Sequence, residues 1–63
     1  MIHLHTPTQK YTFLTRAAAE LFAETEELNE NLCILHEDGR VLSFRRKGDS
    51  KFTVITKKPD AQL

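Results

Sequence analysis

Residues 32–44, LCILHEDGRVLSF, decide the expected fold. Two strand-like apolar runs flank Asp38 and Gly39, and Asp-Gly between such runs is among the strongest short signals for a β-hairpin. Residues that face each other across a hairpin point to the same side of the sheet. A two-residue turn therefore puts four apolar side chains on one face, which we expect to be the core face. The pairs are Cys33 with Phe44 and Leu35 with Leu42.

The run KFTVIT, residues 51–56, is expected to add a third strand to this hairpin. A three-residue loop places Phe44 opposite Phe52 and continues the apolar face, whereas a two-residue loop places Phe44 opposite Thr53 and interrupts it. Strand register follows the buried face, so we favour the odd-length loop, with Gly48 at a positive φ. The three strands then form an antiparallel meander.

An amphipathic helix is expected before the meander. Thr15 is a candidate N-cap, because its hydroxyl can accept from a free backbone N–H in the first turn. Apolar side chains recur at spacings of three and four through the following residues, which is the pattern of a helix with one buried stripe. Asn29 and Asn31 are candidates to end the helix, since Asn tolerates the left-handed conformation. The expected stripe consists of Leu14, Ala18, Leu21, Phe22, Thr25 and Leu28.

The N-terminal residues 1–6, MIHLHT, alternate apolar side chains with histidines, which is the period of a half-buried strand. A second short apolar segment follows at residues 11–14. The fold class is therefore α+β: one amphipathic helix packed on a small antiparallel sheet, in the order N-terminal strand, helix and three-stranded meander. We expect one domain at residues 1–58 and a flexible C-terminal tail at residues 59–63.

Composition narrows the protein class. The 63 residues include one cysteine, Cys33, so an intramolecular disulfide is impossible and a reducing compartment fits best. The N-terminus lacks a cationic leader followed by an apolar stretch, and no apolar run reaches the roughly 18 residues of a membrane span. We expect a cytoplasmic protein, and its size suits a bacterial or phage accessory protein.

Catalytic and metal-binding patterns are weak. Ser43 and Ser50 have no neighbouring histidine, and the two glycines are both explained as turn residues. His3 and His5 share a strand face and His36 is the third imidazole, but no fourth zinc ligand is identifiable. We therefore expect a non-enzymatic protein with no cofactor, no metal and no small-molecule substrate.

The charges are strongly segregated although the formal net charge is zero. Residues 20–38 hold seven acids and no lysine or arginine, whereas residues 44–51, FRRKGDSK, hold four bases around a glycine. Either the basic turn pairs with the acidic end of the helix, within a subunit or across a dimer, or each patch contacts an outside partner. The candidate macromolecule-binding residues are Arg45, Arg46, Lys47 and Lys51 on the turn and Glu20, Glu24 and Glu27 on the helix.

The favoured register leaves four aliphatic side chains on the outer face of the sheet. Singly scattered aliphatic side chains are ordinary surface, but a contiguous patch indicates an interface. We expect self-association as a homodimer through this patch, which consists of Leu32, Ile34, Val41 and Ile55.

These patterns favour a small protein-interaction or regulatory module with polarised charge, which self-associates and acts by binding another macromolecule, with a protein as the expected partner. The alternative is a nucleic-acid-binding protein that lays the basic 45–51 hairpin on the phosphate backbone as a wing. The helix is acidic, however, and Phe44 and Phe52 are both assigned to the core, which leaves no ring to stack on bases. No membrane partner is expected.

Overall fold

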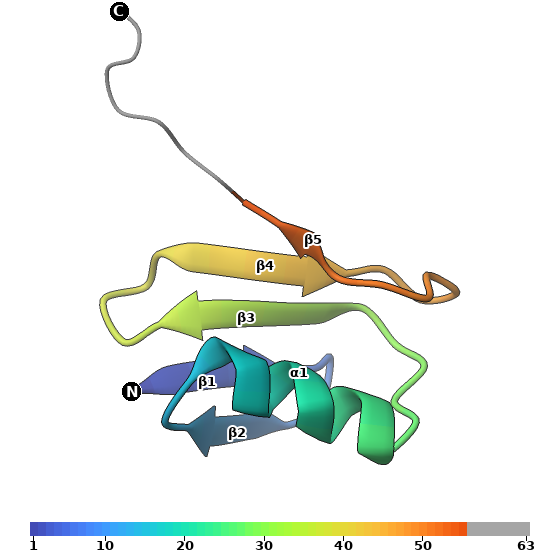
Figure 1. Cartoon of the computed structure of the whole chain (residues 1–63), viewed down its shortest axis with the longest axis horizontal. Coiled ribbons are helices and arrows are strands. Elements are labelled where there is room, and N and C mark those ends of the chain that lie inside the picture. The colour runs from blue at the N-terminus through green and yellow to red at the C-terminus, as the bar shows by residue number, and fades with distance from the viewer. Residues whose placement is uncertain (56–63) are drawn as a thin grey trace, which may run out of the picture.

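The computed structural model describes residues 1–55 and places a single helix on one face of a five-stranded antiparallel sheet (Figure 1). The expected α+β class is confirmed. The expected domain boundary at residue 58 and the tail at 59–63 lie outside the described residues. The strand order in the sheet is β2-β1-β3-β4-β5. The elements are β1 (Ile2–His5), β2 (Lys10–Phe13), α1 (Arg16–Thr25), β3 (Leu32–His36), β4 (Val41–Arg45) and β5 (Thr53–Val54).

An N-terminal hairpin adds two strands to the expected meander. Its turn is closed by the Thr6 N–H, which donates to the Gln9 carbonyl at 2.9 Å, and by the Thr6 hydroxyl, which accepts from the Gln9 N–H at 2.8 Å. Pro7 suits this turn because its ring presets φ. The apolar segment after the turn is thereby used as strand β2, and β1 lies between β2 and β3 in the sheet.

The helix begins as expected but buries a different stripe. The Thr15 hydroxyl accepts from the Ala18 N–H at 3.1 Å, which confirms Thr15 as the N-cap. The buried side chains are Ala19 and Ala23, whereas Leu14 and Leu21 are 81% and 63% exposed, so the expected stripe through both leucines is wrong.

The orientation of the helix follows from an aromatic cluster. The Phe22 ring lies between two rings of β2, with centroid distances of 4.8 Å to Tyr11 and 5.2 Å to Phe13. Such packed rings bury large areas and fix the side of the helix that faces the sheet. Ala19 and Ala23, four residues apart, then let the backbone approach closely. Leu14 and Leu21 are left on the outside.

The helix ends earlier than the asparagines suggested. The Leu28 N–H donates to the Ala23 carbonyl and the Glu27 N–H to the Glu24 carbonyl, both at 3.0 Å, which is the bonding pattern of a Schellman motif. Glu27 takes the left-handed position of this motif, with φ of 52°. The expectation that Asn29 or Asn31 ends the helix is therefore wrong.

The core lies on the opposite face of the β3–β4 hairpin from the one expected. Cys33 does pair with Phe44, but Leu35 pairs with Val41 instead of Leu42, because the register shifts between Ile34 and Leu35. Leu32 and Ile34 are 3% and 0% exposed, so their assignment to the outer face is wrong.

Strand β1 explains this reversal. Its apolar residues Ile2 and Leu4 point to one side and its histidines to the other, and Leu4 pairs directly with Ile34. Burying Leu4 under α1 therefore also buries Ile34, since paired residues share a face. The face without a helix carries His3 and His5 of β1 and, from β3, Cys33 and the half-buried Leu35.

The β4–β5 register also differs from the expectation. Phe44 pairs with Thr53, not with Phe52. This register places Phe44 and Phe52 on opposite faces of the sheet, with Phe52 on the helix side beside the core. Gly48 does adopt a positive φ, 94°, as expected.

Candidate functional site

A groove of about 400 Å³ runs beside α1, on the helix face of the sheet. It forms because α1 packs across β1 and β2 and leaves the β4 side of that face uncovered by a helix (Figure 1). Side chains spaced three and four apart share one side of a helix, so α1 contributes a continuous wall. The helix wall consists of Ala17, Glu20, Leu21 and Glu24, and the opposite wall of Arg45, Ser50, Lys51 and Phe52.

Glu20 is held in place by two contacts. One of its carboxylate oxygens accepts from the Ser43 hydroxyl at 3.2 Å and lies 3.2 Å from the Arg16 guanidinium. Ser43 is fully buried, so the carboxylate satisfies a hydroxyl that would otherwise lack a partner away from water. Glu24, one turn further along the helix, is exposed.

Arg45 is the buried cation of the groove. Its side chain is on the helix face and the residue is 8% exposed. The guanidinium donates to the Leu28 carbonyl and lies 5.1 Å from the centre of the Phe52 ring, a cation–π arrangement. Among residues 1–55 it forms no ion pair. Arg45 therefore stabilises the joint between helix end and sheet, and it is not one of the freely exposed bases that the sequence suggested.

The basic turn is attached to the helix exit by amide side chains. The side-chain oxygen (Oδ1) of Asn31 accepts from the Lys47 backbone N–H at 2.9 Å, and Oδ1 of Asn29 accepts from the Gly48 backbone N–H at 3.1 Å. These contacts fix the turn through its backbone and do not use its side-chain charges. In the described part of the chain no ion pair joins the turn to the acids near the helix end, which are Glu24, Glu26, Glu27 and Glu30.

The groove unites four of the seven residues proposed from the sequence for macromolecule binding: Glu20, Glu24, Arg45 and Lys51. The other three lie elsewhere. Arg46 points to the opposite face, with its guanidinium 5.7 Å from the centre of the Phe44 ring. Lys47 is exposed on the turn and Glu27 at the helix end.

The four residues expected to form a dimer interface are divided between two environments. Leu32 and Ile34 belong to the core. Val41 and the exposed Ile55 line a separate hollow of about 290 Å³ with Arg40 and Leu42. They do not form one outer patch, because the register shift and the reversal of faces separate them.

Sequence reasoning missed the apolar part of the groove, Leu21 and Phe52, because both had been assigned to the core. One signal in the sequence could have found Leu21. Leu21 and Phe22 point about 100° apart on the helix, and the aromatic residues Tyr11 and Phe13 favour Phe22 as the one packed on the sheet.

The cysteine and the histidines offer no assembled chemical centre. Burial raises the pKa of the Cys33 thiol, so the thiol stays protonated and is a weak nucleophile at neutral pH. His3 and His5 lie together with ring centroids 6.4 Å apart. Within residues 1–55 no three potential ligands gather in a way that could hold a metal ion.

No helix among residues 1–55 has the length and apolar character needed to cross a membrane.

Comparisons of the chain with protein-family models, with curated proteins and with solved structures find no match.

Proposed function

We propose that this chain is a small non-enzymatic module that binds a protein partner through the groove beside α1. The observation that carries the proposal is that exposed apolar, acidic and basic side chains line the same groove. Leu21 is 63% exposed there and faces a wall that contains the Phe52 ring. An acidic wall with Glu24 and a basic wall with Lys51 border these apolar groups.

The groove favours an extended or helical peptide segment with mixed chemistry. An apolar side chain of the partner would lie between Leu21 and Phe52 and remove both from water, which is favourable by roughly 25 cal/mol per Å² of apolar area. A partner lysine or arginine would reach Glu24, and a partner carboxylate or backbone carbonyl would reach Lys51. Glu20, already held by Arg16 and Ser43, gives the acidic wall a fixed position.

The same features argue against a polyanion in this groove. Phosphates would meet the carboxylates of Glu20 and Glu24 on the helix wall, and like charges repel. Opposite charges on the two walls also orient an approaching partner, so we expect association to slow as the salt concentration rises. A single free cysteine agrees with a reducing compartment, and we place the module in the cytoplasm as part of this proposal.

A selection from a phage-displayed library of short random peptides tests the proposal. We expect enriched sequences with a lysine or arginine near a large apolar residue. Two leucines provide a matched pair of variants, because both are exposed and only Leu21 lines the groove. Leu21→Ser should abolish binding of the selected peptide, and Leu14→Ser should preserve it. Failure to enrich any sequence, or equal loss with both variants, would contradict the proposal.

A further inference from the structure

The face of the sheet opposite α1 is open. Strand pairing places side chains from all five strands in one row across this face, and β1 to β4 add a second row beside it. Figure 1 shows α1 on one side of the sheet only. In the described part of the chain no helix packs on this face. The first row consists of Lys10, His5, Cys33, Phe44 and Thr53, and the second of Thr12, His3, Leu35 and Val41.

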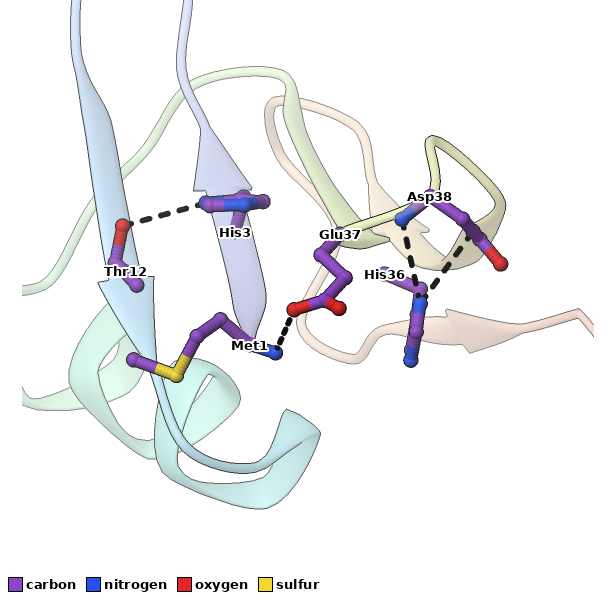
Figure 2. Close-up of polar contacts among 6 residues, drawn as sticks. All are labelled: Met1, His3, Thr12, His36, Glu37 and Asp38. Carbon is purple, nitrogen blue, oxygen red and sulfur yellow. Dashed lines mark hydrogen bonds and ion pairs between the residues drawn. The ribbon is translucent and has the colours of Figure 1, made fainter.

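The open face carries aromatic rings on β4 and on β1, the two strands that flank β3. The half-buried Phe44 ring on β4 lies under the Arg46 guanidinium, 5.7 Å from ring centre to the charged carbon. On β1, the rings of His3 and His5 lie 6.4 Å apart, and His3 is positioned by a contact of 3.2 Å between its Nδ1 and the Thr12 hydroxyl (Figure 2). Phenylalanine, histidine and arginine are among the side chains on which unpaired bases stack.

The charge of the open face is positive. Lys10 lies at the β2 end of the first row and the Arg46 guanidinium lies beside Phe44, so both add positive charge to the face. Glu37, which follows β3, directs its carboxylate to the Met1 ammonium at 2.6 Å (Figure 2). The acids of α1 lie on the other side of the sheet. The face is therefore complementary to a polyanion, unlike the groove.

We infer that this open face binds single-stranded nucleic acid, with a base replacing the Arg46 guanidinium on the Phe44 ring and phosphates contacted by Arg46 and Lys10. A single strand is favoured over a duplex, because bases must be unpaired to lie flat on a ring. The objection drawn from the sequence does not apply, since Phe44 is not in the core. This surface differs from the wing suggested by the sequence, which was the basic 45–51 hairpin and included Arg45. The inference goes beyond the proposed protein-binding function and does not rest on it.

Fluorescence anisotropy of labelled single-stranded oligonucleotides of about 12 nucleotides tests the inference, with DNA and RNA probes and a duplex of equal length. We expect single strands to bind more tightly than duplex, with log Kd changing by about 1.4 per log unit of salt if two phosphates are neutralised. Measurements at about 50 mM and about 200 mM salt give this slope.

The hairpin supplies two matched pairs of variants. Phe44→Leu removes the ring from the open face and Phe52→Leu removes one from the groove. Arg46→Gln and Lys51→Gln each remove one positive charge from the same loop, on opposite faces. We expect Phe44→Leu to weaken binding about 5- to 160-fold and Arg46→Gln to weaken it and flatten the salt dependence. The two groove variants should bind like the wild type.

Circular dichroism melting verifies that each variant is folded, and Arg46→Gln, an exposed position, keeps the test valid if Phe44→Leu unfolds. Three results would overturn the inference: no binding of either single strand at low salt, equal effects of the two members of a pair, or duplex binding as tight as single-strand binding. Sedimentation that finds a dimer broken by Phe44→Leu would also overturn it, because a second copy would then cover the face.

Discussion

Adjacent residues of β3 test the assignment of the core face most severely. Ile34 is 0% exposed and pairs with Leu4, whereas Leu35 is half-buried on the open face. Truncating a fully buried isoleucine to alanine costs about 2–5 kcal/mol, because apolar contacts are lost and a cavity remains. Full burial of a leucine contributes about 1.5–3 kcal/mol, so Leu35→Ala at a half-buried site should cost about 1 kcal/mol.

These costs are large for so small a protein. At about 0.05–0.15 kcal/mol per residue, the whole domain is stable by about 3–9 kcal/mol. Ile34→Ala should therefore lower the melting temperature by at least about 8 °C or unfold the chain, given a shift of about 4–8 °C per kcal/mol in domains of this size. Leu35→Ala should lower it by about 4–8 °C.

Urea unfolding followed by circular dichroism measures both variants. The slope of the unfolding free energy with urea must stay constant between them, so that a change in midpoint reports stability alone. A larger loss for Leu35→Ala than for Ile34→Ala would show that the core lies on the other face, and would refute both the groove and the open face described above.

Three further predictions concern the ends of the helix and the hairpin. Glu27→Gly should stabilise the fold by about 1 kcal/mol, measured by urea unfolding. Glycine adopts the left-handed φ of 52° without strain, and the substitution removes a negative charge from the helix C-terminus. A lower urea midpoint would contradict this prediction. Arg45→Met should destabilise the fold by about 1–3 kcal/mol, because it leaves the Leu28 carbonyl without its hydrogen-bond donor. Lys47→Gln should leave the stability unchanged. Equal effects of the two substitutions would contradict a structural role for Arg45. The pKa of the Asp38 carboxyl lies below its ordinary value of 3.8, chiefly because the carboxylate accepts a hydrogen bond from the Arg40 backbone N–H. The ionised carboxylate therefore stabilises the fold fully above about pH 3.8. This stabilisation is lost as the pH falls through the lower pKa of Asp38 in the folded protein. Asp38→Asn should flatten that part of the acid unfolding curve, and an unchanged curve would count against the contact.

Local signals in the sequence predicted local structure well. The Thr15 N-cap and the positive φ of Gly48 each depend on a few neighbouring residues. Cys33 pairs with Phe44 as predicted, but the pair lies beyond the register shift that gives Leu35 a different partner. The core face could not be obtained in this way, because β3 is apolar on both sides. Leu32 and Ile34 alternate with Cys33 and Leu35, so the period of two carries no preference, and the choice is made by the distant strand β1.

The candidate site was only partly accessible from the sequence. The segregation of charge pointed to Glu24 and Lys51, which do line one groove. The burial of Arg45 could not be foreseen, because it depends on the Leu28 carbonyl, which the left-handed turn at Glu27 turns toward β4. The groove itself exists because Phe22 fixes the helix over β2, a contact between separate elements.

The most direct test of the proposed function is an NMR titration of the isotope-labelled protein with the peptide selected by phage display. The account predicts that amide shifts change at Ala17, Leu21, Glu24 and Lys51 and stay constant at His5 and Cys33. Changes confined to the open face, or no changes at all, would contradict a protein-binding groove beside α1.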